Sequence, residues 1–125
     1  MIFGIGVDVV QISRIASIWN RWGDRFLQRV FTKQEIEYCL LRKNPSPHLA
    51  ARFAAKEAFL KALGTGYAQG VRWKDIEIIR NSSARPKVEL HSRTRTLCQS
   101  HGVDRIHLSM SHDGDYGLGQ VILEV

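Results

Sequence analysis

Acidic and basic side chains share one stretch of this sequence and form its first candidate for chemistry. Glu57 and Lys61 are four residues apart, so a helix places them one turn apart on one face. Arg52 and Lys56 have the same spacing and fall on another face. Two interpretations compete: an ordinary solvated ion pair, or charged groups held for a ligand. We favour the ligand, because much of the stretch is apolar enough to be buried, where charges cost more free energy than at a surface.

A second carboxylate, Asp8, lies near the start of the chain. It shares one face of a predicted strand, Ile2 to Val10, with Gly4 and Gly6. A face so bare leaves room for a ligand or for a closely packed helix. Alternatively, Asp8 ends the strand and caps a turn, which is a common role for aspartate. Both interpretations stay open at the level of the sequence.

The stretch from Leu49 to Gly64 is the predicted helix that positions the first group of charges. Its residues are strong helix formers, and Gly64 stands where a helix commonly ends. Gly64 and Gly66 also let a backbone come near a ligand. One side of the helix has only small side chains, which let another element approach closely: Ala51, Ala55, Ala58 and Ala62. The bare face of the first strand is a fitting partner for this alanine strip.

Arginines and aromatic residues are mixed along the segment from Ser13 to Phe31. We expect this segment to be helical, with Ser13 as its N-cap and a break near Gly23. Its side chains suit a docking surface, and they equally suit the solvated face of an ordinary packed helix. The residues concerned are Arg14, Arg21, Arg25 and Arg29, with Trp19, Trp22 and Phe26.

The remaining segments predict an α+β domain with a small, mainly antiparallel sheet packed against helices. Thr32 and Glu35 form a capping-box pattern that opens a helix, and the loop from Asn44 to Pro47 ends it. Strands are expected at 73–80, 86–90, 105–112 and 118–125, a turn at 81–84 and a helix at 92–101. With 125 residues and no repeat or linker, we expect a single domain over residues 1–125.

The composition limits the class of partner and the compartment. A net charge of +6 predicts an anionic partner, such as a phosphorylated cofactor, an acidic protein, nucleic acid or a membrane surface. Cys39 and Cys98 are far apart and lack the spacing of a metal site, which indicates free thiols in a reducing compartment. No segment reaches transmembrane length, so we expect a cytoplasmic protein.

Several segments of the chain resemble one known family. They are Gly4–Arg14 (GIGVDVVQISR), Arg52–Gly64 (RFAAKEAFLKALG), Trp73–Ile78 (WKDIEI) and Leu108–His112 (LSMSH). The resemblance is to the holo-[acyl-carrier-protein] synthases of the 4′-phosphopantetheinyl transferase superfamily, and it runs nearly end to end. It implies transfer of the phosphopantetheine arm from coenzyme A to a serine of an apo acyl carrier protein. Release of adenosine 3′,5′-bisphosphate and dependence on Mg²⁺ are implied as well.

The resemblance also assigns residues to this reaction. It implies that Asp8 and Glu57 bind the Mg²⁺, with Lys61 beside them on the coenzyme A pyrophosphate. The serine proton would go to a metal-bound water or to Glu57, and that choice stays open. The residues expected to contact coenzyme A are Arg52, Lys56, Lys61, Gly64, Gly66, Ser111 and His112.

A carrier protein and an oligomeric state are implied too. Carrier proteins of this class are acidic, so we expect Arg14, Arg21 and Arg25 to attract one, with Trp22 and Phe26 as apolar anchors. Short members of the family form homotrimers with active sites between subunits, so a neighbouring subunit should complete the coenzyme A pocket. The pathway expected is fatty acid biosynthesis, while the sequence leaves open whether the carrier is a fatty-acid or a polyketide one. Neither nucleic acid nor a membrane is an expected partner.

Two rival functions agree less well with the residues. A non-catalytic basic module that binds nucleic acid or an acidic protein would explain the charge and the arginine–aromatic mixing. It leaves unexplained the carboxylate of Asp8 beside glycines and that of Glu57 within the most basic helix. A different Mg²⁺-dependent nucleotide enzyme, such as a phosphohydrolase, would need a phosphate-loop pattern or a cluster of acids, and the sequence has neither.

Overall fold

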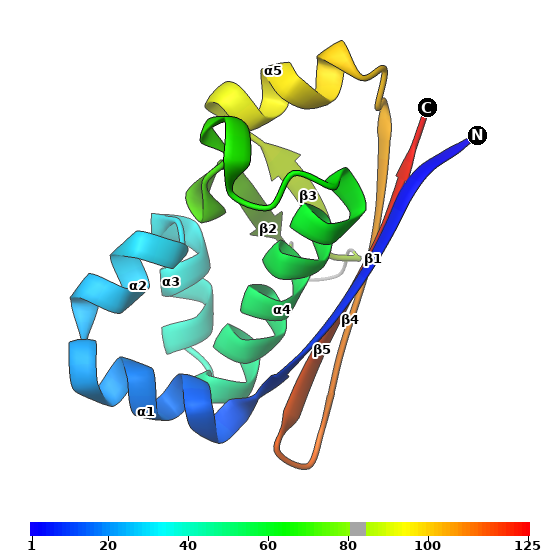
Figure 1. Ribbon diagram of the computed structural model, residues 1–125. Coiled ribbons are helices and arrows are strands. Elements are labelled where there is room, and N and C mark those ends of the chain that lie inside the picture. The colour runs from blue at the N-terminus through cyan, green and yellow to red at the C-terminus, as the bar shows by residue number, and fades with distance from the viewer. Residues whose placement is uncertain (81–84) are drawn as a thin grey trace.

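The computed structural model describes residues 1–80 and 85–125 and is built on an antiparallel sheet of three strands. Strand β5 (Tyr116–Glu124) lies in the middle, between β1 (Ile2–Gln11) and β4 (Arg105–Asp113). The long helix α4 (Pro45–Leu63) runs along one face of this sheet (Figure 1). The predicted α+β architecture with antiparallel strands against helices is confirmed.

Two smaller groups of elements flank α4 (Figure 1). The first contains three helices, α1 (Ile12–Trp22), α2 (Asp24–Val30) and α3 (Lys33–Leu40). The second contains the 3₁₀ turns η1 (Ala68–Gly70) and η2 (Trp73–Asp75), the antiparallel pair β2 (Ile76–Ile79) and β3 (Lys87–Leu90), and helix α5 (Ser92–Ser100). Among the described residues, no helix is both long and apolar enough to cross a membrane.

The bare face of β1 packs against the alanine strip of α4, as predicted. A Cβ atom added at Gly6 would lie 1.9 Å from the carbonyl oxygen of Ala58. Gly119 on β5 faces Ala55 in the same way, with 2.4 Å between its added Cβ and the Ala55 amide nitrogen. Real Cβ atoms do not approach backbone so closely, so the helix can lie on the sheet only because glycine stands at these positions.

Helix α1 receives its cap from a distant turn. The predicted break at Gly23 is confirmed, because this residue has a φ of 57° between α1 and α2. Ser13 is not the N-cap, since the helix already begins at Ile12. Instead, Ser13 donates from its amide and its hydroxyl to the Asp115 carboxylate, at 2.9 and 2.6 Å. The prediction was wrong because a carboxylate 102 residues away accepts these hydrogen bonds.

Two further element boundaries differ from the expectations. Helix α4 begins at Pro45 instead of after Pro47, because a proline in the first helical turn sacrifices no hydrogen bond. Within the strand expected at 73–80, Trp73–Asp75 forms a 3₁₀ turn and only Ile76–Ile79 pairs with β3. The turn expected at 81–84 lies outside the described residues.

The other expected elements are confirmed to within two residues at each end. The capping box is present, with the Thr32 hydroxyl accepting from the Glu35 amide and the Glu35 carboxylate accepting from the Thr32 amide. Helix α4 ends at Gly64, which has a left-handed φ of 86°. Local sequence signals therefore placed most helix and strand ends correctly.

The face of the three-stranded sheet turned away from α4 is apolar and exposed. Side chains alternate along a strand, so the residues between the β1 glycines point outward. Ile5, Val7 and Val9 are 57%, 49% and 55% exposed, and Leu118 of β5 is 36% exposed. We call this surface, formed by Phe3, Ile5, Val7, Val9 and Leu118, the outer sheet face.

Candidate functional site

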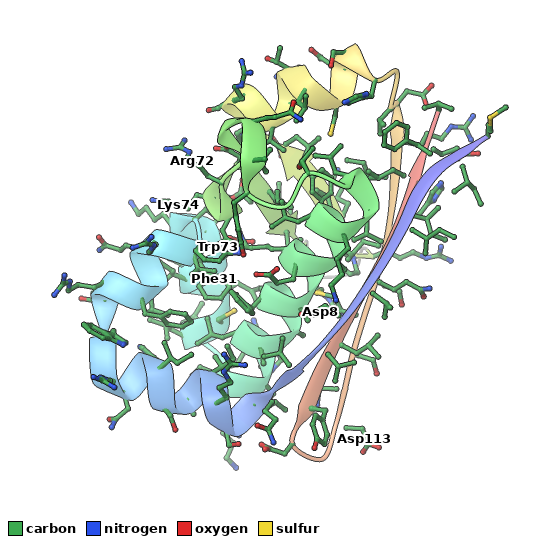
Figure 2. The ribbon with its side chains drawn as sticks, viewed as in Figure 1. Asp8, Phe31, Arg72, Trp73, Lys74 and Asp113 are labelled. Atoms are coloured by element: carbon green, nitrogen blue, oxygen red, sulfur yellow. The ribbon has the colours of Figure 1, made fainter. Side chains whose placement is uncertain are left out.

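Asp8 and Lys61 meet where β1 crosses the carboxyl-terminal half of α4. The Lys61 ammonium donates to Asp8 Oδ1 at 3.1 Å and to the Val7 carbonyl oxygen at 3.0 Å. Figure 2 shows Asp8 on the side of β1 that faces α4. The packing of the strand on the helix thus brings together two predicted site residues that are 53 positions apart.

Glu57 is half-buried one turn before Lys61, and two aromatic residues hold its carboxylate. Its Oε1 accepts hydrogen bonds from the Tyr67 hydroxyl and from Trp73 Nε1, the latter at 3.1 Å. Burial first, and then the hydrogen bond to Glu57, raise the pKa of Tyr67, so the hydroxyl keeps its proton and donates. Sequence reasoning missed the role of both aromatic residues, although Tyr67 directly follows the glycine loop and Trp73 comes six residues after Tyr67.

The predicted catalytic residues line adjoining hollows. Asp8 and Glu57 line a cavity of about 410 Å³, together with Arg14 from α1. A second hollow, of about 330 Å³, shares Glu57 and is also lined by Lys61, Gly64, Gly66 and Tyr67. The carboxylates, the ammonium and the glycine loop are therefore gathered at one place on the molecule, as the sequence predicted.

The chemistry of these donors fits a metal ion that takes some of its ligands from a substrate. Over residues 1–80 and 85–125, no group of three or more His, Cys, Asp or Glu side chains could hold a metal ion alone. Asp8 and Glu57 offer hard carboxylate oxygens, and Mg²⁺ is typically held by one or two carboxylates, several waters and substrate phosphates. The residues present therefore fit Mg²⁺ bound with a phosphate-containing substrate.

Lys56 lies elsewhere, and its predicted contact with coenzyme A is wrong. Its side chain is completely buried, and its ammonium donates to Glu35 Oε1 at 2.8 Å. The carbonyl oxygens of Trp73 and Ile76 accept its other two hydrogens at 2.9 and 2.8 Å. Burial lowers the pKa of Lys56, and the Glu35 carboxylate opposes that shift. With every ammonium hydrogen bonded, Lys56 ties α3, η2 and β2 to α4 and has none left for a ligand.

Arg52 and His112 lie in a second cluster, near the amino-terminal half of α4. The Arg52 guanidinium is 4.3 Å from the Tyr38 ring centre, and its buried Nε has no hydrogen-bond partner among the described residues. The rings of His48 and His112 are 6.2 Å apart. Burial, followed by the charges of Arg52 and His112, lowers the pKa of His48. Ser111 points to the opposite face of the sheet from His112, so the residues predicted for coenzyme A fall into separate groups.

The residues predicted for carrier docking lie on α1 and α2, and all are exposed except Phe26, which is half-buried against the core. The guanidinium groups of Arg21 and Arg25 lie 5.1 and 5.8 Å from the ring centre of Trp22. A cavity of about 410 Å³ is lined by Trp22, Arg25, Phe26 and Arg29. Arg14, earlier on α1, instead lines the cavity of Asp8 and Glu57. Helix α1 therefore carries both the exposed Arg21 and, at Arg14, a residue of the cavity that contains Asp8 and Glu57.

Comparison with known proteins agrees with this geometry. The family model of the 4′-phosphopantetheinyl transferase superfamily matches residues 4–121. A holo-[acyl-carrier-protein] synthase of Koribacter versatilis is 47% identical over 124 residues, which cover 99% of each chain. The crystal structure of the holo-[acyl-carrier-protein] synthase from Neisseria meningitidis matches with a TM-score of 0.92 at 35% identity, over the whole of both chains. That of the Helicobacter pylori enzyme in complex with coenzyme A gives 0.84 at 29% identity, over 96% of this chain and 99% of that one.

Proposed function

The chain belongs to the 4′-phosphopantetheinyl transferase superfamily and, within it, to the holo-[acyl-carrier-protein] synthases, and we propose that it transfers phosphopantetheine from coenzyme A to a serine of an apo acyl carrier protein. The serine oxygen bonds to the β-phosphorus, the bond from that phosphorus to the bridging pyrophosphate oxygen breaks, and adenosine 3′,5′-bisphosphate leaves. The observation that carries the proposal is the convergence of Asp8, Glu57 and Lys61 from β1 and α4.

Asp8 and Glu57 would hold Mg²⁺ in this reaction. The bound ion would neutralise charge on the pyrophosphate during transfer. Lys61 is 56% exposed, so its ammonium can reach a pyrophosphate oxygen while it stays beside Asp8. The serine proton passes to Glu57 or to a water molecule in the cavity.

Two groups of residues would bind coenzyme A. Lys61, Gly64 and Gly66 line the hollow beside Glu57, where the pyrophosphate would lie. The cluster of Arg52 and His112 has positive charge and a buried N–H, that of Arg52 Nε, with no partner in residues 1–80 and 85–125, and both features suit a further phosphate such as the 3′-phosphate. We assign this cluster to the site of a neighbouring subunit in a homotrimer. The exposed apolar outer sheet face supports such self-association.

The acidic carrier protein would dock on α1 and α2. Arg21 and Arg25 supply exposed positive charge, and Trp22, which is 48% exposed, supplies an apolar anchor between them. Arg14 lies next to Asp8 and Glu57 on the same helix. A carrier seated on these helices would therefore present its serine toward the two carboxylates.

We place this reaction in the cytosol, in fatty acid biosynthesis. Cys39 and Cys98 are both free and buried, which agrees with a reducing compartment. Burial raises the pKa of each thiol to about 11, so both stay protonated and unreactive at neutral pH.

The proposal is tested by incubating the protein with coenzyme A, Mg²⁺ and an apo acyl carrier protein, followed by mass spectrometry of the carrier. We expect the carrier to gain one phosphopantetheine arm, with an equal amount of adenosine 3′,5′-bisphosphate in solution. A carrier whose acceptor serine is replaced by alanine is the matched control and should stay unmodified. EDTA should stop the transfer and added Mg²⁺ restore it. A carrier that gains no mass with any divalent ion would contradict the proposal.

A further inference from the structure

Both hydrogen bonds that the Glu57 side chain accepts fall on the same oxygen. The Tyr67 hydroxyl and Trp73 Nε1 donate to Oε1, whereas in the described part of the chain no hydrogen bond reaches Oε2. One oxygen of the carboxylate therefore has two protein donors and the other has none among the described residues, and Glu57 lines the cavity that it shares with Asp8. Neither donor belongs to the residues assigned above to metal, coenzyme or carrier.

We propose that Tyr67 and Trp73 are positioning residues that hold Glu57 as a one-oxygen metal ligand and thereby make the site select Mg²⁺ over Ca²⁺. This inference rests on the proposed function, because it takes Glu57 to be a metal ligand. The two aromatic residues act through the orientation of the Glu57 carboxylate, and the ring of Tyr67 also lines the hollow beside it.

The reason for the selectivity lies in how the two ions bind carboxylates. Mg²⁺ requires near-octahedral geometry with oxygens at about 2.0–2.1 Å, whereas Ca²⁺ accepts six to eight oxygens at about 2.3–2.6 Å, often both oxygens of one carboxylate. When Oε1 of Glu57 accepts from two donors, the carboxylate offers a single oxygen to the ion, which suits Mg²⁺. If both donors were removed, the carboxylate could turn and bind the ion with both oxygens, which suits Ca²⁺.

Trp73 is held rigidly enough to act in this way. Its carbonyl oxygen accepts from the buried Lys56 ammonium at 2.9 Å, and its ring centre lies 5.9 Å from that of Phe53. Figure 2 shows Trp73 turned toward the interior beside α4, whereas its neighbours Arg72 and Lys74 point outward. The Lys56 ion pair thus positions the backbone from which the indole reaches Glu57.

Tyr67 comes from the loop after α4, and this loop is anchored at its far end. The Tyr67 ring packs edge-on against Trp73, with ring centres 4.8 Å apart at 72°. Two residues later, the carbonyl oxygen of Gln69 accepts from Arg93 Nε at 2.8 Å. The loop therefore presents the hydroxyl to Glu57 in a defined position, while 49% of the Tyr67 surface stays exposed.

The test compares metal affinities of the coenzyme A-saturated protein with those of Tyr67→Phe, Trp73→Phe and the double variant. Each change removes one donor and keeps an aromatic ring. Mn²⁺ binding is followed by electron paramagnetic resonance, and Mg²⁺ and Ca²⁺ are measured by competition. Loss of groups that orient metal ligands typically weakens binding by roughly 10- to 100-fold. We expect the double variant to lose Mg²⁺ affinity by at least roughly tenfold, and Ca²⁺ affinity by much less.

Trp19→Phe is the matched control, because Trp19 is also a half-buried indole that packs in the same core cluster as Trp73. It should leave the ratio of Mg²⁺ to Ca²⁺ affinity unchanged. If Trp73→Phe does not fold, Tyr67→Phe, a change at a residue that is 49% exposed, must lower that ratio by itself. An unchanged ratio in folded variants of an active, metal-binding wild type overturns the positioning role alone. A wild type that binds no divalent ion overturns the metal site and this inference together.

Discussion

Two lysines of α4 show how position along one helix decides the chemistry of a side chain. Lys61 is 56% exposed and reaches Asp8, whereas Lys56 is fully buried against Glu35. They are five residues apart, which turns them about 140° from each other around a helix with 3.6 residues per turn. The same ammonium group is therefore available to a phosphate at one position and ties secondary-structure elements together at the other.

Replacing Lys56 by methionine separates these two roles. Glu35 would keep its buried negative charge but lose the cation that compensates it, so we expect the free energy of unfolding to fall by about 3–5 kcal/mol. Urea denaturation measures the loss, and the double variant Lys56→Met/Glu35→Gln should recover part of it because the buried charge is gone. A stable Lys56→Met protein with a raised KM for coenzyme A would instead support the predicted contact between Lys56 and a phosphate of coenzyme A.

Asp8→Ala and Glu57→Ala test the two carboxylates directly. Loss of a group that merely orients a metal ligand costs roughly 10- to 100-fold in activity, so loss of a ligand should cost more. The fold should survive, because the Asp8–Lys61 pair is partly exposed and such pairs contribute about 0–1 kcal/mol. The mass assay measures transfer and circular dichroism the fold, with Glu89→Ala, an exposed acid on β3, as control. A fully active variant would remove that carboxylate from the site.

At the scale of elements, α4 places the site because it is buried on nearly every side. Its small residues let β1 and β5 lie directly against it, which brings Asp8 alongside the helix. Its buried ion pair at Lys56 fixes η2, which presents Trp73 to Glu57. The charges proposed to serve a ligand, Glu57 and Lys61, lie one turn apart on the one face of this half of the helix that is not fully buried.

Helix α1 and the start of α2 provide a charge test of carrier docking. Arg21→Glu/Arg25→Glu reverses two exposed charges beside Trp22, outside the Asp8–Glu57 cavity. Because steering by complementary charge raises association rates by roughly 10- to 1,000-fold, we expect binding of the acidic carrier to slow at least tenfold. Coenzyme A affinity, measured by calorimetry, should stay nearly the same.

The control for this charge reversal is Lys74→Glu/Lys87→Glu, which changes the net charge equally at two exposed positions on η2 and β3. Biolayer interferometry with immobilised carrier gives the association rates. Equal slowing by both double variants would mean that the overall charge attracts the carrier and that α1 and α2 are not its docking surface.

At the scale of the whole molecule, the outer sheet face is an apolar surface that the single chain leaves uncovered. A line of apolar side chains on β1 is exposed, although soluble proteins seldom expose a large contiguous apolar patch. The Arg52–His112 cluster lies apart from Asp8 and Glu57 on the same chain. A homotrimer would cover the apolar face and bring such a cluster to the neighbouring site.

Ile5→Lys tests this assembly. A lysine in the middle of the outer sheet face would have to be buried on association, so we expect light scattering to give the mass of one chain, against three for the wild type. The KM for coenzyme A should rise with the loss of the neighbour. Leu41→Lys, at a residue 81% exposed beyond α3, is the control and should stay trimeric. A wild type that is monomeric at assay concentrations would contradict the assembly.

The sequence by itself determined the local elements and which candidate site residues share one face of a helix. Periodicity and glycine positions specify which residues share a face, so the alanine strip, the bare face of β1, the capping box and the end of α4 at Gly64 were predictable. Glu57 and Lys61 were predictable as a pair because they are one helical turn apart. Their meeting with Asp8 followed from a family resemblance and from the match of small residues on two elements.

Only the tertiary structure decided which charged groups are buried and paired with other groups of the protein. Lys56 carries the same local signals as Lys61, yet its burial depends on Glu35 and two carbonyl groups from other elements. The cap that Asp115 provides for α1 and the hydrogen bonds of Tyr67 and Trp73 to Glu57 are likewise made between distant segments. Sequence spacing describes neighbours along one element, whereas hydrogen bonds form between whichever groups the packing of separate elements brings within reach.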